Sequence, residues 1–141
     1  MNLKDLYSQI INENSRSSVH RHAVPGATHT LEGVNPSCGD DIILSLRVSG
    51  GVVEDAGFTG SGCAISQASA SLMLDLVIGR ELEDARRLCD IFHRMITGSV
   101  TDQELEELED AAALQGISKI PARVKCAVLS WHTLEEMLVE P

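Results

Sequence analysis

The sequence predicts an α+β fold, in which a three-stranded antiparallel sheet packs against about four to five helices. Strand-like apolar runs fill residues 29–58, and Gly50-Gly51 separates two of them. Apolar residues recur at helical spacing before this segment and again from residue 63 onward. With 141 residues, 43% of them hydrophobic, the chain is about the size of one domain, so a single domain is expected over 1–141.

The N-terminal region is predicted to be a short amphipathic helix followed by a mobile linker, together spanning residues 1–26. The helical stripe consists of Leu3, Leu6, Tyr7, Ile10 and Ile11. Residues 12–26 are polar and end in Pro25-Gly26, a turn signal. His20 and His22 lie in this linker, where solvated histidines are favoured over metal ligands.

Three strands are predicted next, at residues 29–34, 42–48 and 52–58. Ser49-Gly50-Gly51 joins the last two as a hairpin, because glycine accepts the positive φ of tight turns. Gly60 and Gly62 are expected to end the third strand. A sheet of this size needs a covered face, which the helices supply.

The helical half begins at Cys63, with a helix to about Ile78 that ends at Gly79. A second helix over 82–97 places Cys89 on its apolar face, where a free cysteine acts as a small core residue.

Two more helices are predicted towards the C-terminus. The capping box of residues 101–104 opens an acidic helix through Leu114, whose glutamates form a solvated face. Pro121 begins the last helix, on which Cys126 lies away from the centre of the apolar stripe.

Composition limits the function classes. The formal net charge of −10 argues against a nucleic-acid partner, which would need basic clusters, and favours a protein partner with a basic rim. No run approaches the roughly 18 apolar residues of a membrane span, and the N-terminus lacks a signal pattern. The cytoplasm is therefore the expected compartment. There, the four cysteines are expected to be metal ligands or reactive thiols rather than disulfides.

Four residues form a candidate metal site, namely Cys38, Asp40, Cys63 and Cys126. Helix N-termini favour thiolates at Cys63 and Cys126, and Gly39 lets Cys38 and Asp40 face one point. Three thiolates and a carboxylate fill a tetrahedral zinc site, and thiolates also hold iron and sulfide.

The spacing alone does not decide whether a metal binds, because the gaps are long and no Cys-x-x-Cys pair occurs. Four negative ligands around Zn²⁺ leave a net charge of −2, which a nearby cation would balance. Arg123 and Lys125 are placed for this role, although both also suit an ordinary basic surface.

Longer motifs carry a family resemblance. They are Pro-Ser-Cys-Gly-Asp at 36–40, Val-Glu-Asp-Ala-x-Phe-x-Gly-x-Gly-Cys at 53–63, Ala-Ser-Ala-Ser-Leu-Met at 68–73, and Leu-Gln-Gly-Ile-Ser-Lys-Ile-Pro-Ala-Arg-Val-Lys-Cys-Ala at 114–127, with a closing Leu-Ser-Trp at 129–131. From about Leu3 to Leu138 the chain resembles the SufU branch of the IscU/NifU N-terminal superfamily. This resemblance implies the sheet-and-helix fold of that superfamily. Lys125 stands where scaffold IscU proteins carry histidine, and the segment from Cys63 to Cys126 is longer than in those scaffolds.

This resemblance implies a role in iron–sulfur cluster biogenesis. It implies that Cys38, Asp40, Cys63 and Cys126 bind zinc, and that Cys38 accepts sulfur with Arg123 supporting the site. The implied partner is a pyridoxal-phosphate cysteine desulfurase of the SufS type, which would make the chain a sulfurtransferase. Two alternatives remain: an iron–sulfur cluster scaffold of the IscU type, and a structural zinc-binding interaction domain.

Overall fold

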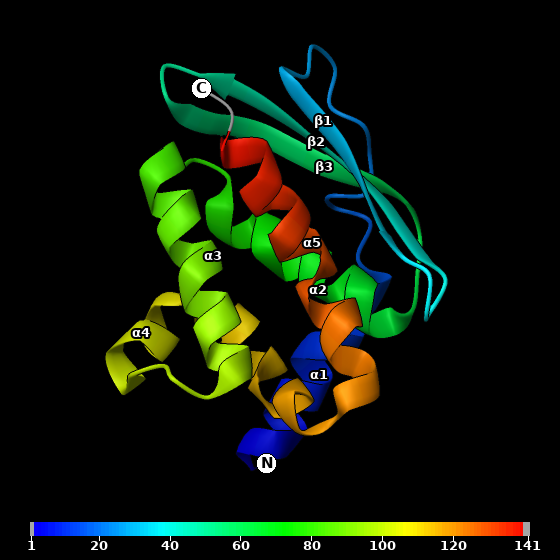
Figure 1. Cartoon of the computed structure of the whole chain (residues 1–141), viewed down its shortest axis with the longest axis vertical. Helices are drawn as coiled ribbons and strands as arrows, with labels where there is room; N and C mark the ends of the chain where they lie inside the picture. Colours follow the sequence, from blue (N-terminus) through cyan, green and yellow to red (C-terminus); the bar gives the residue numbers. More distant parts are fainter. Residues whose placement is uncertain (1, 140–141) are drawn as a thin grey trace.

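The computed structural model describes residues 2–139 and confirms the predicted fold class. In chain order the elements are α1 (Leu3–Arg16), β1 (His29–Asn35), β2 (Asp40–Ser49), β3 (Val52–Ser61), α2 (Ala64–Val77), α3 (Leu82–Thr97), α4 (Asp102–Glu107), the 3-10 helix η1 (Glu109–Lys119) and α5 (Pro121–Val139). The sheet lies on one side of the molecule and the helices on the other (Figure 1). No helix within residues 2–139 is long and apolar enough to cross a membrane.

The sheet is antiparallel with strand order β1-β2-β3. Gly50 and Gly51 join β2 to β3 with φ values of 59° and 76°, as predicted for this hairpin. Of the two glycines predicted to end the third strand, Gly62 follows its last residue, Ser61, whereas the prediction for Gly60 is wrong because β3 runs through it. Gly60 has φ +109°, and a side chain there would overlap the Asp41 carbonyl oxygen. This glycine permits a close strand contact instead of ending the strand.

Helices α2 and α5 cover the inner face of the sheet, and α3 packs outside α5 (Figure 1). Helix α5 approaches β1 closely, since a side chain at Gly33 would overlap the Thr133 hydroxyl. Phe92 of α3 stacks on Trp131 of α5 with ring centroids 4.1 Å apart. Cys89 is fully buried here, as predicted for a core thiol.

The N-terminal segment differs from its prediction. Helix α1 continues to Arg16, and the following residues lie along the free edge of β3, where the Phe58 N–H donates to the His20 carbonyl at 2.8 Å. His20 is buried and its Nε2 lies 2.6 Å from Asp75 of α2, so the prediction of a solvated His20 is wrong, whereas His22 is exposed. The Val24 N–H also donates to Ser45 Oγ at 3.1 Å. These contacts anchor the segment that the sequence predicted as a mobile linker.

The predicted acidic helix through Leu114 is also wrong in its extent. The capping box between Thr101 and Glu104 is present, but α4 ends at Glu107. Glu109 then takes φ 51°, and the chain continues as η1. This change of path buries Leu108 and Leu114 in the core, and local helix signals do not encode that packing.

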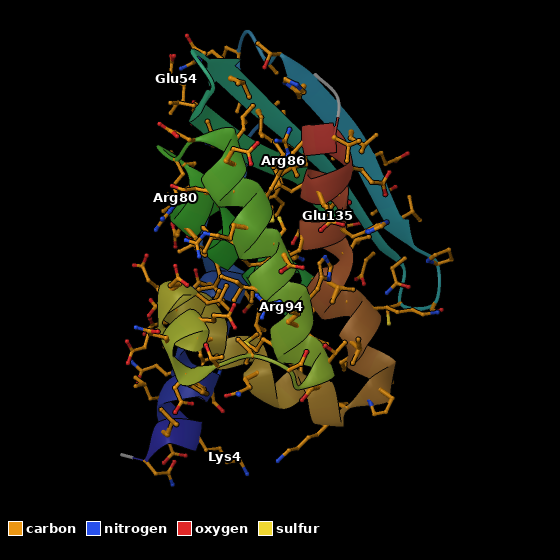
Figure 2. All side chains as sticks on the ribbon, turned by 60° about the vertical axis from the view of Figure 1, so that its left-hand side comes forward. Lys4, Glu54, Arg80, Arg86, Arg94 and Glu135 are labelled. Atoms are coloured by element: carbon orange, nitrogen blue, oxygen red, sulfur yellow. The ribbon has the colours of Figure 1, made fainter. Side chains whose placement is uncertain are left out.

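The labelled arginines Arg80, Arg86 and Arg94 lie on the helical side of the molecule (Figure 2). Arg86 illustrates their structural use, because its guanidinium donates to the Leu138 carbonyl near the end of α5. A cation at a helix C-terminus satisfies orphan carbonyls and opposes the negative end of the helix dipole.

Candidate metal centre

Strand register brings two distant parts of the chain to one end of the sheet. Asn35 pairs with Asp40 at the end of the β1–β2 ladder, and Asp41 pairs with Ser61 at the end of the β2–β3 ladder. The β1–β2 turn, which carries Cys38, therefore lies beside the start of α2. Gly39 takes φ +71° in this turn, as expected for a sharp bend at Cys38.

Packing of α5 against α2 brings Cys126 to the same end. Ser69 of α2 donates its hydroxyl to the Ala127 carbonyl at 2.5 Å, and Trp131 Nε1 donates to Ser69 Oγ at 2.9 Å. All three groups are buried, so this network holds the two helices at a set separation. Cys126 precedes Ala127 and is thereby placed opposite the β1–β2 turn.

Three of the four predicted ligands meet directly. The Cys38 and Cys126 sulfurs and an Asp40 carboxylate oxygen all lie within 4.8 Å of one another. Cys63 is not within that group but adjoins it, because its backbone N–H donates to Asp40 Oδ1 at 2.8 Å and its thiol neighbours Cys126. Cys38 and Cys63 are half-buried, whereas Asp40 and Cys126 are fully buried.

Asp40 is held as an ionised carboxylate. Its Oδ1 accepts from the Cys63 N–H and from Ser66 Oγ at 3.1 Å, and its Oδ2 accepts from Asn35 Nδ2 at 3.1 Å. Burial alone would raise the pKa of Asp40, but these bonds and one with Cys126 lower it below its ordinary value. The carboxylate is thus preorganised as an acceptor.

The prediction that the helix position of Cys126 favours its thiolate is wrong. Burial raises the pKa of the Cys126 thiol well above its ordinary value, and contacts with Cys38, Asp40 and Cys63 act in the same direction. Cys126 lies beyond the first turn of α5, where the helix dipole has little effect. Grouping acidic ligands therefore favours the protonated thiol unless a cation is present.

Arg123, which the sequence predicted to support this site, lies close to the three cysteines. A hydrogen bond with Cys126 and the electrostatic influence of Cys63, Cys126 and Cys38 raise the pKa of Arg123. Lys125 is exposed. The guanidinium thus lies beside the three thiols from the first turn of α5.

Two further residues were missed by sequence reasoning. Asn35 donates to Asp40 and lies 3.7 Å from Cys126 Sγ, and Ser66 donates to Asp40 from the first turn of α2. Both are buried polar side chains. Asn35 directly precedes the Pro-Ser-Cys-Gly-Asp motif at 36–40. Its place beside that motif was the sequence signal that could have indicated it.

The donor set fits a thiophilic metal ion. Thiolate sulfurs select zinc, copper(I) or iron–sulfur clusters, and a single carboxylate is the hardest ligand among them. Asp40 and Cys126 are buried and form the inner side of the candidate site. Cys38 is half-buried and forms its outer side.

Comparisons with known proteins agree with this geometry. Residues 9–127 match the family model described as the NifU-like N terminal domain. The chain belongs to this family.

Among curated relatives, the zinc-dependent sulfurtransferase SufU of Bacillus subtilis is 42% identical over 96% of this chain and 90% of its own. The iron–sulfur cluster assembly scaffold protein IscU of Thermotoga maritima is 44% identical over 98% of this chain and 96% of its own.

A crystal structure of a putative iron–sulfur cluster assembly scaffold protein for the SUF system, from Fervidobacterium islandicum, superposes with a TM-score of 0.88. It is 32% identical and covers 97% of this chain and 99% of that one. The family is thus one of iron–sulfur cluster assembly proteins, and relatives of similar identity are named either as sulfurtransferase or as scaffold.

Proposed function

We propose that this protein is a zinc-bound sulfur acceptor in iron–sulfur cluster assembly, which takes persulfide sulfur from a pyridoxal-phosphate cysteine desulfurase onto Cys38. The observation that carries the proposal is the cluster of Cys38, Asp40 and Cys126, in which Cys38 is the accessible sulfur. The similarity to a relative named as a zinc-dependent sulfurtransferase supports it.

Each residue has a distinct part in this proposal. Asp40, Cys63 and Cys126 would hold zinc together with Cys38, and zinc would keep the thiols deprotonated at neutral pH. Arg123 would offset the remaining negative charge from its place beside the three thiols. Cys38 lies in a glycine-containing turn at the outer side, so it can face a partner without disturbing the buried ligands.

The transfer step is a thiolate–persulfide exchange. The Cys38 thiolate attacks the outer sulfur of the desulfurase persulfide, a new S–S bond forms on Cys38, and the desulfurase cysteine leaves as a thiolate. No external oxidant is needed, because the sulfur arrives already at the persulfide level. Electrostatic attraction from a basic partner surface would suit the net charge of −10.

A scaffold that assembles a cluster on the same residues is the second candidate, favoured by the Thermotoga relative named as IscU. Lys125 weighs against it, because an ammonium group directly before Cys126 is a poor ligand.

Metal analysis and mass spectrometry after incubation with desulfurase and cysteine test the proposal. We expect about one zinc per chain and added sulfur on Cys38. Cys38→Ser should abolish sulfur acceptance while the chain stays folded, and Cys89→Ala, a thiol outside the cluster, should leave acceptance unchanged. Iron as the dominant metal, a stable cluster after anaerobic reconstitution, or persulfide mainly on Cys63, Cys89 or Cys126 would contradict the proposal.

A further inference from the structure

Asn35 occupies the inner wall of the metal centre. It is the last residue of β1, pairs with Asp40 across the ladder, and is only 5% exposed. Its carbonyl accepts from the Cys38 N–H at 3.3 Å, which closes the β1–β2 turn. The Asn35 backbone therefore shapes the turn that carries Cys38, while its side chain faces Asp40 and Cys126.

The Asn35 amide nitrogen contacts two proposed ligands from distant parts of the chain. Nδ2 lies 3.1 Å from Asp40 Oδ2 and 3.7 Å from Cys126 Sγ. An ionised carboxylate can only accept hydrogen bonds, so the amino end of the amide must face Asp40. The two amide hydrogens can then serve the carboxylate and the sulfur together.

Ser66 makes a useful contrast. Its hydroxyl also donates to Asp40, but to the other oxygen, Oδ1, and it donates as well to the Cys63 carbonyl at 3.0 Å. Ser66 thus fixes the carboxylate from the α2 side. Asn35 ties the carboxylate to the sulfur on α5.

We infer that Asn35 is a positioning residue, which holds Asp40 and Cys126 at metal-binding separation and donates to both in their anionic forms. This inference rests on the proposed zinc site. Side chains that orient metal ligands typically alter metal affinity by about 10–100-fold when removed.

Zinc affinity, measured by competition with a chromogenic chelator, gives the first test. Asn35→Ala should weaken zinc binding by about 10–100-fold, and Asn35→Asp should weaken it further, because a carboxylate would then face Asp40 and the Cys126 thiolate. Ser66→Ala is the matched control and should have a smaller effect. If wild-type protein binds no zinc, the proposed function fails; if wild type binds zinc and Asn35→Ala binds it equally well, only the role of Asn35 fails.

Cobalt substitution gives a readout that a purely structural role would not change. Removal of a hydrogen bond to sulfur makes the thiolate a stronger electron donor, so the sulfur-to-cobalt charge-transfer band should move to lower energy in Asn35→Ala and stay in place in Ser66→Ala. An unchanged band in Asn35→Ala would overturn the proposed contact with Cys126.

A double variant separates positioning from folding. The effect of Asn35→Ala on zinc affinity should shrink in an Asp40→Ala background, because part of the interaction is already lost. If Asn35→Ala fails to fold by circular dichroism, Asn35→Ser replaces it, since its shorter side chain cannot reach both groups. Wild-type zinc affinity in a folded Asn35→Ser would then overturn the inference.

Discussion

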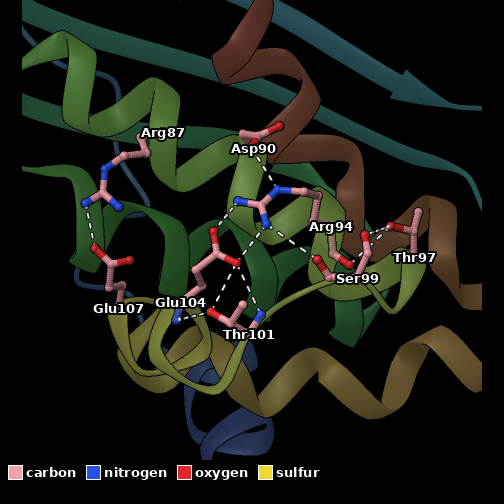
Figure 3. A network of polar contacts seen from close by, with 8 residues as sticks. All are labelled: Arg87, Asp90, Arg94, Thr97, Ser99, Thr101, Glu104 and Glu107. Carbon is pink, nitrogen blue, oxygen red and sulfur yellow. Dashed lines mark hydrogen bonds and ion pairs between the residues drawn. The ribbon is translucent and has the colours of Figure 1, made fainter.

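Two polar clusters in this molecule are built on opposite electrostatic rules. At the junction of α3 and α4, opposite charges pair: Arg94 contacts Asp90 at 2.9 Å and Glu104 at 2.5 Å, and Arg87 contacts Glu107 at 2.7 Å (Figure 3). At the candidate metal centre, by contrast, the acidic side chains of Cys38, Asp40 and Cys126 lie next to one another. The paired network balances its own charges, whereas the second cluster would carry a net negative charge if its thiols were deprotonated.

The pKa directions express this difference. In the α3–α4 network, the hydrogen bond from Arg94 lowers the pKa of Glu104 to about 2. In the metal centre, burial and neighbouring ligands raise the pKa of the Cys126 thiol. The first arrangement stabilises its charges by pairing them, whereas burial in the second favours the protonated Cys126 thiol.

Removal of the proposed zinc ion by a chelator should cause the largest loss of thermal stability. A ligand bound at about 1,000 times its Kd stabilises the folded state by about 4 kcal/mol, which corresponds to a loss of about 10 °C in Tm on chelation. Cys126→Ser should reproduce the loss in differential scanning calorimetry. Cys89→Ala serves as the cysteine control, and an equal Tm with and without chelator would show that the cluster needs no cation.

Loss of Asp40 should come next. Asp40→Ala removes the acceptor of the buried Cys63 N–H and Asn35 amide, and leaves Ser66 with the Cys63 carbonyl alone. We therefore expect about 3 kcal/mol of destabilisation in urea unfolding, in addition to altered metal exchange. The matched control is Asp41→Ala, one residue along on the opposite face of β2. A hydrogen bond with Asp41 and the charge of Asp41 raise the pKa of Glu32, its neighbour on β1. Equal losses in the two variants would contradict a special role for Asp40.

A change at Gly62 should have a smaller effect on the same site. A Cβ atom at Gly62 would overlap Ser66 Oγ and lie 2.9 Å from Asp40 Oδ1. Gly62→Ala should therefore cost about 1–2 kcal/mol of stability and weaken zinc binding. Gly116→Ala has open space around it and is the matched control. Unchanged zinc affinity in Gly62→Ala would show that the carboxylate tolerates displacement.

The smallest effect is expected at the paired cluster. The pKa of Glu104 is lowered from 4.5 to about 2, so its contribution is fully present above pH 4.5 and is lost as the pH falls towards 2. Glu104→Gln should flatten the pH dependence of the urea midpoint in that window. Exposed Glu106→Gln removes the same charge and should keep the wild-type slope. Identical slopes for all three proteins would mean that the Arg94 pair adds nothing to stability.

Local signals were sufficient for much of the fold. The Gly50-Gly51 hairpin, the helix over 82–97, the capping box at Thr101 and the helix start at Pro121 all lie where the sequence predicted them. Each depends on a residue whose own backbone preference sets a turn, a cap or a helix start. The errors fall where packing overrides that preference, as in the switch from α4 to η1 and in the burial of His20 against Asp75.

By itself the sequence determined the chemical inventory of this protein: three cysteines and an aspartate of metal-binding type, an arginine to accompany them, and the strands and helices that carry them. Only the tertiary structure decided their relation. It brought Cys38, Asp40 and Cys126 within 4.8 Å, left Cys63 beside that group, and added Asn35 as a donor to both Asp40 and Cys126. The physical reason is that ligand type is a property of single residues, whereas distance, burial and shared hydrogen bonds arise from strand register and helix packing between segments far apart in the chain.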